Sequence, residues 1–96
     1  MNQSKYILTT PIFSKQQLCI VELMAQGWEN AEIGRRLFLS PKTIEHHIWH
    51  IYDKIKQIED TENKNLRVIA ILAYQDIQKE LKNGCLTALL LGVPQN

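Results

Sequence analysis

The most constraining feature of the sequence is a stripe of isoleucines that follows a helix-capping pair. Ser40 and Pro41 are typical of an N-cap followed by the first helical residue, because Pro lacks a backbone donor that the first turn leaves unused. Isoleucines then recur at i, i+4, i+7 and i+11, namely Ile44, Ile48, Ile51 and Ile55. This spacing places them on one narrow face of a helix over about 41–56, and we expect that face to pack against other helices.

Three further segments show helical spacing, and none alternates with the period of two that is typical of a strand. The first begins after Ser14, an acceptable N-cap, and ends at Gly27, which fits the position after a C-cap. We expect its apolar side to consist of Leu18, Val21 and Ala25, with Ile20 and Met24 beside them. The pattern predicts an all-α fold.

A second, short helix is predicted from about Asn30, interpreted as its N-cap, to Phe38. Gly34 lies in its middle, where Gly costs ~1 kcal/mol relative to Ala. Such a cost is easier to accept where another helix crosses closely, so we expect a close helix crossing at Gly34.

The fourth helix is predicted to open near Asn65 and to close at Asn83 and Gly84. Its expected core stripe consists of Leu66, Ala70, Ala73, Ile77 and Leu81. Val68, Ile71 and Leu72 fall on the opposite face, which a monomer would turn toward water. A helix with two apolar faces usually has two neighbours, so this second face, with Gln75, predicts a homodimer interface.

At 96 residues the chain can enclose one core only, so we expect a single domain over 1–96. Its parts are an N-terminal arm (1–12), three helices (13–58), a polar loop (59–65), and the fourth helix with an apolar C-terminal extension (66–96). The arm fits either an extended segment or a turn before the helix. The extension has three readings: packing on its own domain, a subunit interface, or membrane attachment.

Composition excludes several classes of protein. A formal net charge of +1 gives no long-range field that favours nucleic acid or an anionic membrane, so any charge argument is local. No apolar run approaches the ~20 residues that a membrane helix needs, and no secretion signal is seen, so we expect a cytoplasmic protein without a membrane partner. Cys19 and Cys85 are expected to pack as reduced, small hydrophobic residues, with a disulfide as the alternative.

Two adjacent helices joined by the tight segment 38–40 form a helix-turn-helix pattern. The sequence of residues 13–58 resembles the LuxR or GerE type of DNA-binding domain. In that family a four-helix unit recognises DNA through its third helix and commonly dimerises through its fourth. The matching positions are Gly27, Asn30, Glu32, Ile33, Leu37, Ser40, Thr43, Ile44, His47, Ile51, Lys54 and Ile55. Beyond this segment, Arg67, Ala70 and Ile71 resemble the family's further Arg followed by Ala and Val.

The chain departs from the family pattern at a few positions. Gln16 and Gln17 stand where the family usually has Arg and Glu, Glu29 replaces a common Ser, and Glu45 occupies a position often held by Lys. The loop 59–65 is also longer than the family's usual turn. These differences bear on sequence preference and dimer geometry rather than on fold.

With the isoleucine stripe inward, the outward side of the third helix includes Glu45, His46 and Trp49. By similarity, these match the positions through which the family touches base edges. Carboxylate, imidazole and indole suit a cytosine amino group, a purine N7 and a thymine methyl, respectively. The phosphate contacts are expected from residues of the second and third helices: Arg35, Arg36, Lys42, Thr43, His47, His50 and Lys54.

Each residue also has a purely structural reading. Glu45 suits a first-turn carboxylate favoured by the helix dipole, and Trp49 suits a dimer interface or a contact with the arm. Trp28 is interpreted as a core or cap residue. His46 and His50 have a zinc-compatible spacing, but no third ligand is evident, so no metal and no cofactor are predicted. The sequence contains neither a phosphate-binding glycine loop nor a nucleophile elbow, so an enzyme is not predicted.

The sequence therefore predicts a transcriptional regulator that binds double-stranded DNA sequence-specifically as a homodimer. RNA polymerase or another regulator stays open as a further partner. The alternative is an adaptor that uses the same scaffold to bind protein without DNA. The charge of the chain suggests this alternative. Residues 1–58 hold seven Lys and Arg against five Asp and Glu, a small excess of positive charge for a phosphate-binding surface.

Overall fold

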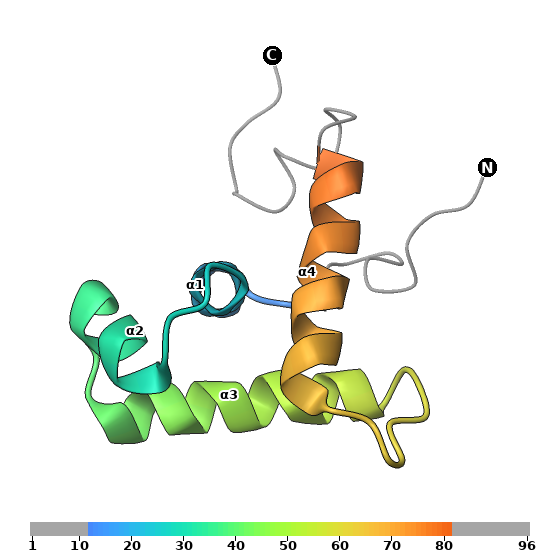
Figure 1. Cartoon of the computed structure of the whole chain (residues 1–96), viewed down its shortest axis with the longest axis horizontal. Helices are drawn as coiled ribbons and strands as arrows, with labels where there is room; N and C mark the ends of the chain where they lie inside the picture. The colour runs from blue at the N-terminus through green and yellow to red at the C-terminus, as the bar shows by residue number, and fades with distance from the viewer. Residues whose placement is uncertain (1–11, 82–96) are drawn as a thin grey trace.

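The structure is a computed structural model that describes residues 12–81, in which four helices and no strand occur. The helices are α1 (Lys15–Ala25), α2 (Asn30–Leu37), α3 (Pro41–Lys56) and α4 (Leu66–Leu81). Figure 1 shows α3 along the base, α4 standing across its C-terminal half, and α1 end-on between α2 and α4. The predicted all-α, four-helix class is confirmed. The predictions for the arm at 1–11 and for the chain beyond 81 lie outside the described residues.

α1 is fixed at both ends by its sequence. The hydroxyl of Ser14 accepts from the backbone N–H of Gln17 at 3.2 Å, and the Gln17 side chain accepts from the backbone N–H of Ser14 at 3.0 Å. This reciprocal capping box starts the helix at the predicted residue. Gly27 follows the C-cap with φ +96°, a conformation that favours glycine.

The buried face of α1 differs from the predicted one. The helix buries Gln17, Ile20, Val21 and Met24, so the inward stripe lies at i, i+3, i+4 and i+7. Ala25 is exposed, and its assignment to the core side was wrong. Cys19 lies on the outward side as a free, exposed thiol, which also contradicts its expected packing among apolar residues. Cys85 lies outside the described residues.

The structure of α2 differs from the prediction in two details. Its N-cap is Glu29, which makes no side-chain capping bond, and Asn30 is already the first helical residue. The tightest neighbour of Gly34 is the turn, because a Cβ there would lie 2.8 Å from the Leu39 carbonyl oxygen. Helix α3 also lies close, with Cγ1 of Ile44 at 3.4 Å from that Cβ position. Gly34 therefore lets the chain turn back tightly into α3.

α3 follows the prediction along its whole length. The Ser40 hydroxyl accepts from the Thr43 backbone N–H at 3.1 Å, and Pro41 is the first helical residue. All four isoleucines of the stripe are buried. Burial of such a side chain is worth about 1.5–3 kcal/mol relative to exposure, so this one face contributes a large part of the core.

The core draws on all four helices and on Phe13 just before them. Its buried apolar residues are Phe13, Ile20, Val21, Met24, Ile33, Ile44, Ile48, Ile51, Ile55, Ile69, Ala70, Ala73 and Ile77. Ile69 was missed by the predicted stripe of α4, whereas Leu66 is only half-buried. The predicted polar loop separates α3 from α4, which begins where the Asn65 side chain accepts from the Val68 backbone N–H at 3.1 Å.

Candidate nucleic-acid interface

The turn between α2 and α3 brings the two helices of the helix-turn-helix pattern together. Phe38 ends α2 in the left-handed conformation (φ 59°, ψ 41°), and the Leu39 backbone N–H donates to the Gly34 carbonyl at 2.8 Å. The side chain of Phe38 is 95% exposed. The turn thus aims α3 along the surface, with its isoleucines inward and its opposite face free of the described chain.

The outward face of α3 holds the three side chains that were predicted to contact bases. Glu45 and His46 are exposed, and Trp49 is 62% exposed. An indole that is largely in water is unusual unless a partner covers it. Lys42, Thr43, Glu45 and His46 also line a shallow hollow of about 440 Å³ at the start of the helix.

Aromatic rings gather further along this face. The Nε2 atoms of His46 and His50 lie 3.1 Å apart, in hydrogen-bond contact, with ring centroids 4.5 Å apart. The Trp49 ring meets the His50 ring edge-on at 5.1 Å. His50 is half-buried and touches both of its exposed neighbours. It therefore orients the two side chains beside it, a role that the sequence did not indicate.

Two of the predicted phosphate-contacting residues of α3 are partly buried and hydrogen-bonded within the protein. Thr43 is half-buried, and its hydroxyl lies 2.9 Å from that of Ser40. Lys54 is half-buried as well, and its ammonium donates to the Gln17 side chain at 2.7 Å. Burial lowers the pKa of Lys54. Lysine has three N–H donors, so this bond leaves others for a phosphate.

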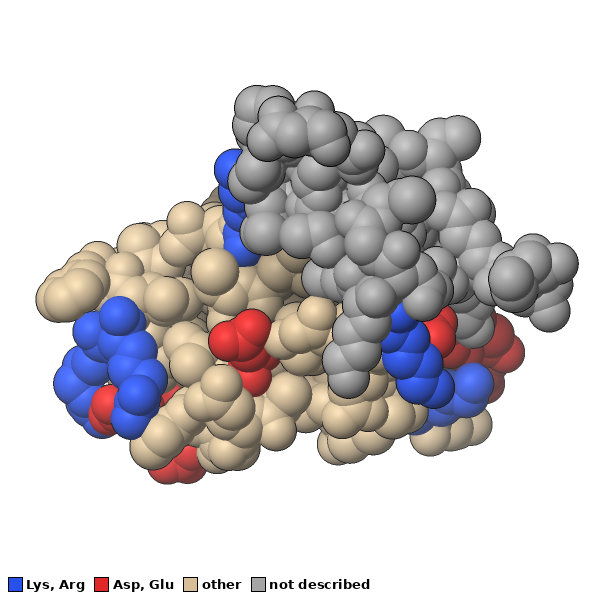
Figure 2. Space-filling model, turned by 90° about the horizontal axis from the view of Figure 1, so that it is seen from above, with Lys and Arg blue, Asp and Glu red and all other residues tan. Residues whose placement is uncertain are grey.

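Arg35 and Arg36 both bind Glu32. The guanidinium groups lie 2.7 and 3.2 Å from its carboxylate oxygens, and the hydrogen bond from Arg35 lowers the pKa of Glu32. The Arg36 guanidinium also stacks on the half-buried Trp28 ring at 3.8 Å from its centroid. Figure 2 shows Lys and Arg side chains gathered at the end of the molecule that carries α2, with acidic atoms among them. The local positive charge is therefore partly neutralised.

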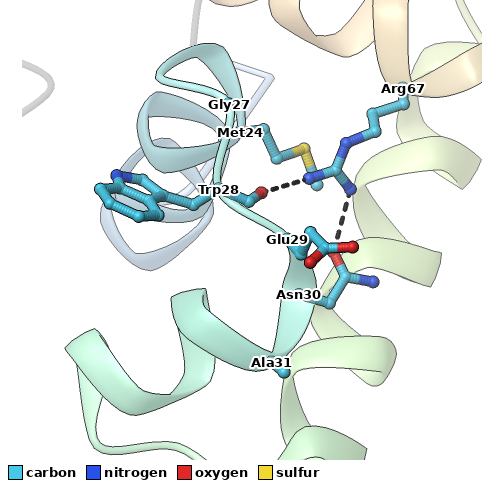
Figure 3. A pocket seen from close by; sticks show the side chains of 7 residues that line it. All are labelled: Met24, Gly27, Trp28, Glu29, Asn30, Ala31 and Arg67. Carbon is cyan, nitrogen blue, oxygen red and sulfur yellow. Dashed lines mark hydrogen bonds between the residues drawn. The ribbon is translucent and has the colours of Figure 1, made fainter.

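Arg67 and Gln17 are two positioning residues whose contacts the sequence did not reveal. Figure 3 shows Arg67 reaching from α4 to the α1–α2 loop, where it donates to the Trp28 carbonyl at 2.8 Å and to the Asn30 side chain at 2.9 Å. These bonds cross a hollow of about 550 Å³. The Gln17 contact with Lys54 likewise ties α1 to α3. The Ser14–Gln17 spacing was the only local signal for Gln17.

The second face of α4 is partly as predicted. Val68 is 50% and Leu72 is 55% exposed, and Gln75 is exposed beside them. Ile71 is half-buried and packs against the core, so the expectation that it faces water was wrong. Val68 and Leu72 therefore form an apolar strip on the outside of the described domain.

A metal centre with three or more protein ligands and a membrane-spanning helix are both absent from the described residues. Within 12–81, no cluster of three or more His, Cys, Asp or Glu is arranged to hold a metal ion. No helix in that range is long and apolar enough to cross a membrane.

Comparison with known proteins gives one consistent match. Residues 11–63 match the family model described as bacterial regulatory proteins, luxR family. Oxygen regulatory protein NreC from Staphylococcus aureus strains JH9, JH1 and USA300 is 45% identical over 56 residues. This alignment covers 56% of the chain but only 26% of NreC, so the chain matches about a quarter of these relatives. No solved structure gives a significant match.

Proposed function

The chain belongs to the luxR family of bacterial regulatory proteins, and from this premise we propose that it binds double-stranded DNA as a sequence-specific transcription regulator. The observation that carries the proposal is the division of α3 into two faces. Its isoleucines are buried, while Glu45, His46 and Trp49 stand on a surface that no described residue covers. A helix presented in this way fits a major groove about 12 Å wide. A regulator of bacterial DNA acts in the cytoplasm.

Each exposed side chain has a matching base edge. The Glu45 carboxylate accepts from a cytosine amino group, and an N–H of the His46 ring donates to a purine N7. The Trp49 indole packs on a thymine methyl. His50 contributes indirectly, since its contacts with His46 and Trp49 limit the number of side-chain arrangements that the free protein must give up.

The proposed phosphate contacts surround this face. Lys42 is exposed at the start of α3, and Arg35 is exposed at the end of α2. Thr43, His47, His50 and Lys54 complete the rim along α3. Because Glu32 holds Arg35 and Arg36, a phosphate must compete with a carboxylate for them. We therefore expect Lys42 to contribute more per contact than either arginine.

A homodimer through α4 completes the proposal. The exposed strip of Val68 and Leu72 offers the apolar centre of a self-complementary contact, with Gln75 and the edge of Ile71 around it. Two symmetry-related copies of α3 then enter successive major grooves. The operator is accordingly expected to be a dyad with half-sites about 10–10.5 bp apart.

Titration of labelled random duplex at two salt concentrations tests the proposal. A dimer that neutralises six or more phosphates loses ~10³ or more in affinity between about 50 and 200 mM salt. The adaptor alternative, favoured by the pairing of Arg35 and Arg36 with Glu32, predicts no such dependence. Absence of duplex binding at the lower salt concentration would reject DNA binding.

Three variants separate the roles of the contacts. Lys42→Ala is expected to weaken binding to all sequences alike, whereas Trp49→Ala and His46→Ala change the preferred sequence by ~1–3 kcal/mol at the affected base pair. Lys79→Ala is the matched control for charge, because Lys79 is exposed near the end of α4 that lies farthest from α3. Equal losses in Lys42→Ala and Lys79→Ala would contradict the proposed docking.

A further inference from the structure

The histidine pair on α3 has a geometry that DNA reading alone does not require. His46 and His50 are one turn apart, and their Nε2 atoms approach to 3.1 Å with the rings nearly perpendicular at 85°. The third histidine, His47, lies outside this pair, with its ring centroid 6.4 Å from that of His46. Two nitrogen atoms of neighbouring imidazoles thus point at one region of space at the protein surface.

We propose that His46 and His50 form a two-nitrogen binding site for a divalent transition-metal ion of the Zn²⁺ class. With zinc–nitrogen bonds of about 2.05 Å, a separation of 3.1 Å corresponds to an angle of roughly 100° at the metal. That angle lies between the ideal octahedral and tetrahedral values. Imidazole is a ligand that Zn²⁺, Ni²⁺ and Cu²⁺ all accept, and two histidines at i and i+4 are a known helical arrangement for zinc.

The proton balance of the histidine pair is compatible with reversible metal binding. In the hydrogen-bonded pair, one Nε2 carries the proton and the other supplies its lone pair. Metal binding needs both lone pairs, so the donor ring moves its proton to Nδ1, and a neutral pair loses no proton overall. A ring that is already cationic must release one. Small rotations suffice, because His46 is exposed and His50 is only half-buried.

The site is open rather than closed. Within residues 12–81 no third His, Cys, Asp or Glu completes the pair, so water fills the remaining coordination positions. Structural zinc sites use four protein ligands, and a site with two is weaker and exchanges its metal. The absence of a third ligand, which led the sequence to predict no metal, therefore limits affinity rather than abolishing binding.

The position of the pair links the metal to DNA, a step that rests on the proposed function. His46 lines the hollow at the start of α3, and His50 touches Trp49. A hydrated ion on both Nε2 atoms occupies the nitrogen through which His46 would meet a base. It also projects from the helix face that must enter the groove. Metal and DNA are thus expected to exclude each other at this face.

Imidazole-resolved NMR of the untagged chain with Zn²⁺ alone tests the metal site. The Nε2 resonances of His46 and His50 should shift together and saturate at one ion per chain, while those of His47 stay in place. His46→Gln and His50→Gln should each weaken zinc binding by at least roughly tenfold, since even loss of a ligand's outer partner costs 10–100-fold. His47→Gln is the matched control. No joint shift, or an equal loss in His47→Gln, would overturn the site.

A second experiment, with duplex DNA, tests separately whether metal and DNA exclude each other. Zn²⁺ at a saturating concentration should raise the protein concentration needed to bind random duplex, and His50→Gln, which keeps His46, should remove this effect. Unchanged duplex affinity with the pair occupied would overturn the exclusion. If the protein binds no duplex even without metal, the proposed function fails, and the NMR titration still decides the metal site.

Discussion

α3 and α4 are helices of equal length, sixteen residues each, with similar inward faces and different outward ones. Both bury an aliphatic stripe, Ile44 and Ile51 on α3 and Ala70 and Ile77 on α4. Outside, α3 presents a carboxylate, imidazoles and an indole, whereas α4 presents Val68 and Leu72. The inward stripe of each helix therefore explains the fold, and the outward residues distinguish the kind of partner.

The difference fits two kinds of surface. Hydrogen-bonding groups beside an aromatic ring suit a hydrated groove with donors, acceptors and methyl groups. A bare aliphatic strip gains mainly from being removed from water, so it suits another protein surface. We accordingly propose DNA as the partner of the α3 face and a second copy of the chain as the partner of the α4 face.

The largest expected effect comes from the inward face of α3. Ile51 is completely buried, so Ile51→Ala should lower the free energy of unfolding by about 2–5 kcal/mol through lost burial and a new cavity. Trp49→Ala, on the same helix, should change it by less than about 0.5 kcal/mol. Urea denaturation measures both. A large loss in Trp49→Ala would show that the indole belongs to the core and not to a binding face.

The next effect concerns the outward strip of α4. Leu72→Glu should leave the monomer folded, because the side chain is exposed, and should weaken self-association by several kcal/mol, or roughly 100-fold or more in Kd. Sedimentation equilibrium measures the monomer–dimer balance. Gln16→Glu adds the same charge at an exposed position on α1 and should not alter it. Ile71 is unsuitable for this test, since its contact with the core couples association to stability.

The features that could be predicted from the sequence are those that depend on residues close together in the chain. The capped start of α3 and its isoleucine stripe follow from spacing within one helix, and both were predicted correctly. Gln17 and Asn30 were misjudged because their partners, Lys54 and Arg67, each lie 37 residues away. A buried amide is stable only with such a partner, and local periodicity carries no information about it.

The candidate site divides in the same way. The outward phase of α3 followed from the stripe, so the exposure of Glu45, His46 and Trp49 could be expected, while their contacts with bases stay a prediction. The pairing of Arg35 and Arg36 with Glu32 depends on i,i+3 and i,i+4 spacing and could have been read from the sequence. The orientation of the His46 and His50 rings could not, because it depends on rotamers.

A smaller effect is expected in the turn that leads into α3. Phe38 holds a left-handed backbone conformation that disfavours side chains other than Gly and Asn, and its ring is almost fully exposed. Phe38→Asn should raise the free energy of unfolding by about 1 kcal/mol by relieving this strain. Phe38→Ala removes the ring but keeps the strain, so it should give no gain. Equal stabilisation by both changes would contradict the backbone explanation.

The smallest effect lies at the edge of the α4 core. Burial, helped by a 2.7 Å hydrogen bond to Glu22, raises the pKa of Tyr74 to about 12. The native state therefore retains a proton that the unfolded chain loses near pH 10, so stability should fall as pH rises from about 10 to 12. Solvent screening keeps the change below about 1 kcal/mol. Tyr74→Phe should reduce this slope in denaturant titrations at several pH values, and an unchanged slope would contradict the assignment.

The division between the two outward faces can be tested in one measurement. Amide and side-chain NMR shifts, recorded as duplex DNA is added to the protein, report which face the DNA contacts. The shifts are expected to concentrate on the outer face of α3, at Lys42, Glu45, His46 and Trp49, and to leave the Val68 and Leu72 side chains nearly unchanged. Shifts centred on the α4 strip, with the Trp49 indole unaffected, would contradict the division between the two faces.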